Sequence, residues 1–508
     1  MNSTFFGLEL SRRALESQQV ALNITGHNIA NANTQGYTRQ IANLTATTPD
    51  SIPAMGRNLS LGSGVTLDTI TRARDAFVDR QFRSETSKQQ YWGSKQDSLT
   101  KVESILNEPS DNSLSSDMNQ FWTAWSDLSK DPENAGARSV VSERAQELTD
   151  SFHNIAQQVS DLKENVDASI KVQITQINSY GQQIKDLNDQ IKRAEVAGDS
   201  PNDLRDQRDS LVDDLSKIVS VRVVETKDTT FADRNVNSYK VIIGNENSTS
   251  NNVLVDDSTL NSLDTNPTTD LNGLSGIAWS DSTPVDLGTK LGTLSADLET
   301  RNNDIPDFEA QVDALAQGIA DAVNALHRTG QGLTIGSGGI DFFTDGTYST
   351  STPSALPGVT AATITLNSAI ETDVNKIATG TTPIDGTTTV TAGDGSIAQA
   401  ISSLSSGWNA LKSLSGFTNT ISASSLSDFY AANVAQLGVK VQQADRMKAG
   451  EDVLVTNVTN QRESLSGVSL DEEMTNLVKF QKSYSAAARM VTMMDDMLST
   501  IMNMGITK

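Results

Sequence analysis

The chain has 508 residues and a formal net charge of −24, with 63 acidic against 39 basic side chains. This balance argues against a nucleic-acid-binding protein, because such a protein needs a basic face to displace counterions from phosphates. The absence of cysteine excludes disulfides, thiolate metal sites and cysteine nucleophiles. No apolar stretch reaches the roughly 18–20 residues that cross a bilayer, so no membrane insertion is expected.

The N-terminal residues predict an amphipathic helix with one strong apolar seam. Four large apolar side chains recur at every seventh position: Leu8, Leu15, Leu22 and Ile29. The second seam of this helix is polar and contains Ser11, Gln18 and Thr25. The helix therefore needs a partner that supplies the rest of its core.

The stretch "NITGHNIANANTQGYTRQ", residues 23–40, is polar and rich in asparagine. Asparagine and glycine tolerate left-handed backbone conformations and bond to their own backbone, so they end helices and shape turns. We expect the first helix to stop here and the chain to turn at Gly36, before Tyr37 and Arg39.

Helix is predicted for much of the middle of the chain. Four side chains share one helical face: Phe121, Trp122, Trp125 and Leu128. From Leu148 to Ala194, apolar residues follow in heptad steps with one slip of phase, which predicts a helix of about 60 residues. At Val221 the pattern changes, and "VRVVETKD" and "YKVIIGNEN" indicate strands separated by turn residues.

The C-terminal residues predict a second amphipathic helix. Ser469, with Glu472 three residues later, fits a capping box that starts it. Its apolar side chains recur largely in steps of three and four, a coiled-coil rhythm: Leu470, Met474, Leu477, Phe480, Tyr484, Val491, Met494, Leu498 and Ile501. Burying a large apolar side chain is worth roughly 1.5–3 kcal/mol, so the two terminal stripes are expected to dock and form one structural unit.

The order of elements predicts a multidomain α+β protein. The N- and C-terminal helices pair as a coiled-coil-like unit, a long helical bundle forms a rod domain, and β-rich modules are inserted into it. The expected divisions are a terminal axial coiled-coil unit of residues 1–65 with 455–508, a helical rod of 66–220 with 291–335 and 396–454, and β-rich insertions at 221–290 and 336–395, as two domains or as one.

No constellation for catalysis or metal binding stands out. The three histidines, His27, His153 and His327, lie far apart in the sequence and lack carboxylates at helical ligand spacing. We therefore expect no catalytic, metal-binding or cofactor-binding residues. The charged side chains of "RDQRD", residues 205–209, can be drawn as a catalytic cluster, but charges three or four residues apart on a helix more often form a solvated ion-pair face.

Methionine is dense near the C-terminus, at Met490, Met493, Met494, Met497, Met502 and Met504. This density is typical of an adaptable peptide-binding surface. Packing within or between subunits of a coiled coil is the commoner use, and both can hold at different times.

"NIANANTQGYTRQ", residues 28–40, resembles the motif that follows the first helix in the bacterial flagellar axial family of rod, hook and hook-associated proteins. The motif residues are Asn28, Asn31, Asn33, Gly36, Tyr37 and Arg39, while Gln35 departs from the proline that is usual in the family. "SGVSLDEEMTNLVKFQKSYSAAARMVTMMDDML", residues 466–498, is more discriminating, because it resembles the end of the members that form the first hook–filament junction. "NEPSDNSLSSDMNQFWTAWSDLSKDPEN" and other internal stretches agree.

The resemblance implies a non-enzymatic structural component of the bacterial flagellum, located outside the cell at the hook–filament junction and cytoplasmic only before export. It implies export by the flagellar type III secretion system and self-assembly into a ring through the terminal helices. The implied partners are the hook protein, the second hook–filament junction protein and an export chaperone at the C-terminal helix, Leu470–Ile501. Two alternatives stay open: another axial protein, such as the second junction protein or a hook-type subunit, or a secreted protein whose strand insertions act as an adhesin or hydrolase.

Overall fold

The computed structural model describes residues 6–54, 57–231, 236–244, 252–266, 276–334, 338–346, 358–381, 393–408, 411, 421 and 423–506, with the backbone alone at 50–54, 57–59, 266 and 503–506. The chain forms two compact units. The terminal unit consists of 1–90, 173–292 and 450–508, and the bundle unit of 91–172 and 293–449. Long helices contribute residues to both units: α2 (Ala76–Leu106), α4 (Ala135–Ala197) and α10 (Leu426–Ser466).

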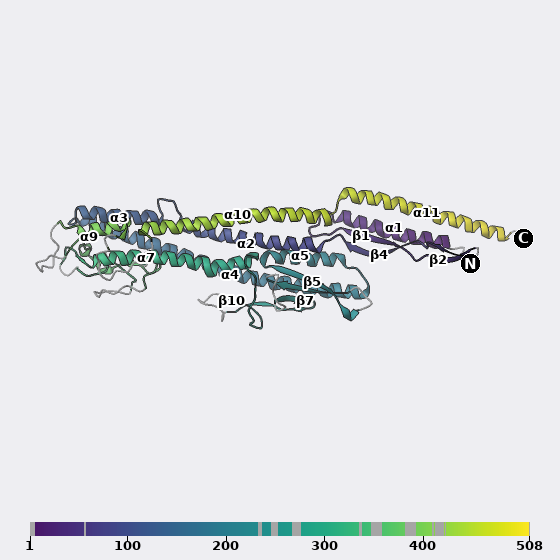
Figure 1. Cartoon of the computed structure of the whole chain (residues 1–508), viewed down its shortest axis with the longest axis horizontal. Coiled ribbons are helices and arrows are strands. Elements are labelled where there is room, and N and C mark those ends of the chain that lie inside the picture. The colour runs from purple at the N-terminus through teal and green to yellow at the C-terminus, as the bar shows by residue number, and fades with distance from the viewer. Residues whose placement is uncertain are drawn as a thin grey trace. The chain divides into compact units, whose positions relative to one another are not determined.

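The two ends of the chain form a helix pair in the terminal unit. Helices α1 (Phe6–Ala30) and α11 (Leu470–Ile506) lie alongside each other, in purple and yellow in Figure 1. The Ser469 hydroxyl accepts from the Glu472 amide at 3.4 Å and caps α11 at its predicted start. The Met494 side chain occupies the space beside Gly7, where a Cβ would lie 2.5 Å from its Cε. The predicted pairing of the terminal helices is therefore confirmed.

Between α1 and α2 the chain forms strands that were not predicted from its sequence pattern. Strand β1 (Gln40–Ala46) pairs antiparallel with β4 (Val65–Arg72), and β2 (Asp50–Ala54) pairs with β3 (Arg57–Leu61). Both β1 and β4 pack on α1. The register between β1 and β4 shifts at Asn43/Leu44, which leaves Asp68 as an extra residue in β4. This bulge interrupts the alternation in "VTLDTITR" and weakens its period-2 signal.

The strands predicted after residue 221 are present in the terminal unit. An antiparallel sheet has the order β5 (Val221–Lys227), β6 (Asn237–Ile243), β7 (Val253–Asp256) and β8 (Thr259–Leu260), and β9 (Leu263–Asn266) pairs with β10 (Gly276–Trp279). Helix α5 (Asn202–Ile218) contacts β5. Asn178 of α4 exchanges hydrogen bonds of 2.8 Å with both backbone groups of Leu263, and these bonds hold β9 against α4.

The bundle unit adds shorter helices to its parts of α2, α4 and α10. They are α3 (Leu114–Lys130), α6 (Gly292–Glu299), α7 (Ile305–His327), α8 (Ser368–Thr372) and α9 (Ser396–Ser402), with a π-helical turn at Thr300–Asp304 before α7. Three-residue 3₁₀ turns lie at Val374–Lys376 and Ser403–Ser405 here and at Thr229–Phe231 in the terminal unit. Two-residue strands pair as β11 (Gly330–Gln331) with β14 (Gly380–Thr381) and β12 (Phe343–Thr344) with β13 (Thr365–Leu366).

An aromatic cluster forms the core of the bundle unit. The predicted face of α3 is buried, and the rings of Phe121 and Trp125 lie 5.7 Å from Phe343 and 5.2 Å from Phe342 respectively. The His327 ring at the end of α7 lies 5.4 Å from Phe342. The side chains that the sequence places on one face of α3 are therefore part of the buried core.

His327 is fully buried and neutral. Its Nε2 accepts from the Ala378 amide at 2.9 Å, so the proton is on Nδ1, which donates to the Ile340 carbonyl at 2.9 Å. Burial lowers the pKa of His327 to about 4, and the charges of Arg138 and Arg328 add to this effect. Protonation of Nε2 would therefore remove the hydrogen-bond acceptor of the Ala378 amide in the folded state.

We expect the bundle unit to lose stability as the pH falls from about 6.5 to about 4. The pKa of His327 is lowered on folding from 6.5 to about 4. As the pH falls, this histidine is therefore protonated in the unfolded chain before it is protonated in the folded chain. The stability that the neutral side chain contributes is fully present only above pH 6.5. The full loss is about 3 kcal/mol. Urea unfolding at pH 7 and pH 4.5 should show a smaller acid loss for His327→Gln than for the parent chain. An equal loss in both would contradict the prediction.

Candidate functional site: the terminal helices and the motif turn

The fully buried side chains of α1 are small or polar. They are Ser11, Ser17, Ala21, Thr25 and Asn28, whereas the predicted seam of Leu8, Leu15, Leu22 and Ile29 is only half-buried. The Ser17 hydroxyl donates to the Val65 carbonyl of β4 at 3.4 Å. Small side chains allow β4 and α11 to approach α1 closely, so the leucine seam is left partly uncovered in the single chain.

Helix α11 keeps much of its apolar stripe in solvent. Of the predicted positions, Leu470, Met474, Tyr484 and Ile501 are exposed, and Leu477, Phe480, Val491, Met494 and Leu498 are half-buried. Met474 and Ile501 are each 54% exposed. A pair of helices can cover only one side of each, so the remaining apolar sides of α11 are available to another chain.

Asn28 is the hub of the motif turn. Its Nδ2 donates to the Gln40 carbonyl at 2.9 Å and to Glu473 Oε2 at 3.2 Å. Its Oδ1 accepts from the Gln40 amide at 3.0 Å and from the Tyr37 hydroxyl at 2.7 Å. The buried amide therefore uses both of its donors and both acceptor positions. One side chain thus joins α1, β1 and the first turn of α11.

A second set of contacts joins the motif turn to the end of α10 and the start of α11. The Arg39 amide donates to the Ser466 carbonyl at 2.9 Å, and the Arg39 guanidinium lies 2.6 Å from Glu472. Gly36 turns the chain with φ of +80°, a conformation that favours glycine. Of the other motif residues, Asn31 and Tyr37 are half-buried and Asn33 is exposed. The structure therefore brings the motif turn and the C-terminal helix together.

A buried ion network lies behind the motif turn, within the terminal unit. It consists of Arg72, Arg74, Arg83, Arg462, Asp79, Asp206, Asp209 and Asp213. Arg72 Nη1 lies 2.8 Å from both Asp206 and Asp209, and Arg83 Nε lies 2.6 Å from Asp213. The Thr38 amide donates to Asp206 at 2.9 Å. The network thus connects the motif turn to β4, α2, α5 and α10.

The prediction of a solvated ion-pair face at residues 205–209 is wrong. Asp206, Arg208 and Asp209 are all less than 10% exposed. Asp206 and Asp209 pair with arginines from outside α5, and the Arg208 guanidinium lies 3.5 Å from the centre of the Tyr239 ring and donates to Asn188. Helical spacing relates only residues of the same helix, so it did not reveal partners that arrive from other segments.

The electrostatics of this network favour its ionised form. Burial by itself raises the pKa of the Asp209 carboxyl, but the charges of Arg74, Arg72 and Arg83 outweigh this effect and hold that pKa below its ordinary value. The neighbouring Tyr37 hydroxyl has a raised pKa because of its burial and the charge of Asp203. The pKa values of Arg72, Arg74 and Arg83 are raised in turn, against the opposing effect of burial, by the charges of the aspartates around them, so Asp209 and these three arginines favour their charged forms.

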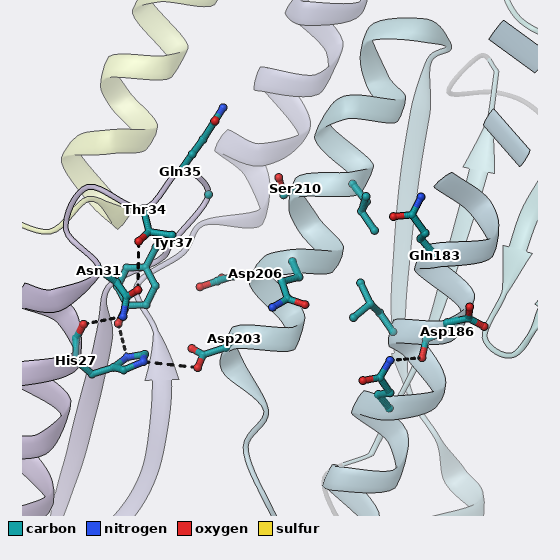
Figure 2. Close-up of a pocket in the computed structure, with 15 residues that line it drawn as sticks. His27, Asn31, Thr34, Gln35, Tyr37, Gln183, Asp186, Asp203, Asp206 and Ser210 are labelled. Carbon is teal, nitrogen blue, oxygen red and sulfur yellow. Dashed lines mark hydrogen bonds and ion pairs between the residues drawn. The ribbon is translucent and has the colours of Figure 1, made fainter. Parts of the chain in front are cut away.

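A cavity of about 660 Å³ lies between the motif turn and helices α4 and α5, all in the terminal unit. Figure 2 shows Asn31, Thr34 and Tyr37 on one wall and Asp203, Asp206 and Ser210 on the opposite one. His27 Nδ1 lies 2.9 Å from the Tyr37 hydroxyl, and its Nε2 lies 3.7 Å from Asp203. Nδ1 therefore joins α1 to the motif turn, and Nε2 faces Asp203 of α5, which is a structural use of the histidine.

Sequence reasoning missed the residues whose partners are remote in the chain. Glu473, which is 3% exposed and bonds to Asn28, was not singled out, and neither were Arg72, Arg74 and Arg83. The only feature of the sequence that could have indicated these arginines as partners was their concentration just before and within α2.

Among the described residues, no three His, Asp or Glu side chains come together in a way that could hold a metal ion. In the same part of the chain, each helix is too short or too polar to cross a membrane.

Three family models match this chain. Residues 99–343 match the model of the flagellar hook-associated protein FlgK helical domain. Residues 8–38 match that of the flagella basal body rod protein, and 460–504 match the flagellar basal body rod FlgEFG protein C-terminal model. The last two matches cover most of α1 and α11, the helices that the structure brings together.

Curated relatives match along the full length of the chain. Flagellar hook-associated protein 1 of Bacillus subtilis is 32% identical over 100% of this chain and 99% of its own length. The protein of the same name from Escherichia coli is 28% identical over 96% and 98%. A solved structure, the flagellar hook junction protein FlgK from Burkholderia pseudomallei, is similar in fold, with a TM-score of 0.59, 17% identity and coverage of 76% of this chain and 100% of that chain.

Proposed function

We infer the function from one premise: this chain belongs to the family of flagellar hook-associated protein 1. It is accordingly a structural component of the flagellum, and its relatives are structural flagellar proteins rather than enzymes. We propose that it forms the junction that links the hook to the filament. In this role it assembles as a ring of identical subunits, between the hook protein and the second junction protein.

One observation carries the proposal of self-assembly: α11 exposes apolar side chains that the described part of its own chain does not cover. Leu470, Met474 and Ile501 are each more than half exposed, in a helix already paired with α1. Exposed apolar surface of this kind marks a protein interface. Neighbouring copies of the α1–α11 pair supply apolar side chains that cover these residues. The half-buried seam of α1 needs apolar contacts of the same kind.

The proposal includes the route to the assembly site. The chain is exported through the flagellar type III system and is cytoplasmic only before that step. An export chaperone covers the apolar side of Leu470–Ile501 until then. The axial unit in the assembled junction is residues 1–65 with 455–508, and the helical rod and β-rich insertions lie outside it.

Loss of the exposed apolar side chains of α11 should strongly reduce incorporation at the hook tip. The double substitution Met474→Asp, Ile501→Asp places charges at positions that are 54% exposed in the single chain. We expect its unfolding free energy to change by less than about 0.5 kcal/mol. Incorporation should fall roughly tenfold or more, because the charges must be desolvated at the interface. Hooks isolated from a deletion strain, incubated with purified chain and then with filament subunits, provide the measurement.

Two further variants sharpen this experiment. Val172→Asp adds a charge at an apolar residue of α4 that is 65% exposed, and it should still support filament growth. A chain that lacks residues 470–508 should not. If the truncated chain still capped hooks and allowed filaments to grow, the terminal helices would not be the assembly site.

A further inference from the structure

Helix α11 carries exposed methionines along one side. Met490, Met493 and Met497 are 41%, 54% and 44% exposed. They follow at spacings of three and four residues, so they share one side of the helix. This row, here the methionine face, lies in solvent in the single chain. Its thioether groups are therefore open to reagents that buried methionines do not meet.

Other methionines of the same chain are sheltered. Met494, next to Met493 in sequence, is half-buried because its side chain fills the space beside Gly7 of α1. Met118 of α3 is 1% exposed in the bundle core. One chain thus contains exposed and sheltered thioethers with otherwise identical chemistry, which allows an internal comparison.

We propose that the methionine face is an oxidation site through which peroxide controls assembly of the subunit. The inference rests on the proposed function, in which α11 packs against neighbouring copies. A thioether sulfur attacks one oxygen of hydrogen peroxide, the O–O bond breaks, and the second oxygen leaves as water with both protons. The sulfur is oxidised to the sulfoxide and the peroxide is reduced.

The sulfoxide changes the face from apolar to polar. An apolar, flexible methionine side chain packs readily at an interface, whereas a sulfoxide oxygen has to lose its hydration when the face is covered. The methionine face contributes little to the core of its own chain, because each of its residues is at least 41% exposed. Oxidation therefore leaves the subunit folded and weakens only its contacts with other copies.

Peptide mapping by mass spectrometry after treatment of the full-length chain with hydrogen peroxide tests the site. We expect Met490, Met493 and Met497 to be oxidised roughly tenfold faster than Met494 and Met118, in the order of their exposure. Equal rates at exposed and sheltered positions would overturn the proposal. Circular dichroism should show no loss of helix at the point where the methionine face is oxidised, and unfolding at that point would also overturn it.

The hook-capping assay described above tests the consequence. The oxidised chain should be incorporated roughly tenfold less than the untreated chain, and methionine sulfoxide reductases should restore incorporation. Undiminished incorporation of an oxidised, folded chain would refute the inference while leaving the junction function intact. Failure of the untreated chain to cap hooks would instead refute the junction function.

Met474 and Met502 are 54% and 66% exposed and would be oxidised as well, so parent and control both carry Met474→Leu and Met502→Leu. In this background the variant Met490→Leu, Met493→Leu, Met497→Leu is the matched control. Methionine and leucine have similar volumes, so this variant should cap hooks before treatment and keep doing so after it. If peroxide inactivated the variant as strongly as the parent chain, another residue would be responsible and the methionine face would be ruled out. If the variant failed to cap hooks before treatment, restoration of the oxidised parent chain by reductase would decide the question by itself.

Discussion

Replacing Asp209 with asparagine is expected to lower the free energy of unfolding of the terminal unit by about 3–5 kcal/mol. The Asp209 carboxylate is buried, 2.8 Å from Arg72, 3.0 Å from Arg74 and 3.6 Å from Arg83. Its loss leaves three buried guanidinium groups with fewer compensating charges. The cost arises mainly from these uncompensated cations rather than from the loss of a single favourable contact.

The Asp209 substitution should also change the response to acid. The pKa of this carboxyl is held below its ordinary value in the folded chain. Its contribution to stability is therefore complete above the ordinary pKa of about 4 and is lost as the pH falls towards the lowered value. The Asp209→Asn variant should lose less stability than the parent chain over that acidic range.

Asp214 is the matched control, because it lies on the same helix but in solvent. It pairs with Lys217 at 2.8 Å, and both side chains are more than 40% exposed. We expect Asp214→Asn to change the unfolding free energy by less than about 1 kcal/mol. Hydrogen exchange of α5 amides in increasing urea measures both variants. Similar effects of the two substitutions would show that the buried ion network does not hold the terminal unit together.

Replacing Asn28 with leucine is expected to destabilise the terminal unit by about 3 kcal/mol and to release the start of α11. Leucine fills a similar volume but offers no hydrogen bond. Both backbone groups of Gln40, the Tyr37 hydroxyl and the Glu473 carboxylate would then lose the partner that Asn28 supplies. The loss of the bond to Glu473 matters most, because that carboxylate is 3% exposed.

The same motif provides the comparison for Asn28. Asn33 is exposed, and Asn33→Leu should cost less than about 0.5 kcal/mol. Amide exchange at Gln40 and in the first turn of α11 should accelerate in the Asn28→Leu variant and stay unchanged in the Asn33→Leu variant. Equal exchange rates in both would mean that the turn is held by its backbone conformation alone.

Some of the candidate site could be predicted from the sequence. The heptads of α1 and α11 located both helices, the capping serine located the start of α11, and the motif resemblance placed the chain among flagellar axial proteins. Strands β1 and β4 were missed because their alternation is broken by a bulge. The charged residues of α5 were assigned to solvent because their arginine partners come from β4, the segment after it, and α2.

The sequence by itself determined which segments are helical, which of their sides are apolar, and that the two ends need a partner, because periodicity is a local property of the chain. Only the tertiary structure decided which side chains of different segments contact one another. Asn28 and Glu473 are 445 positions apart, and Asp209 meets arginines more than 120 positions away. No local pattern encodes such pairs, since each depends on the fold that brings the two side chains together.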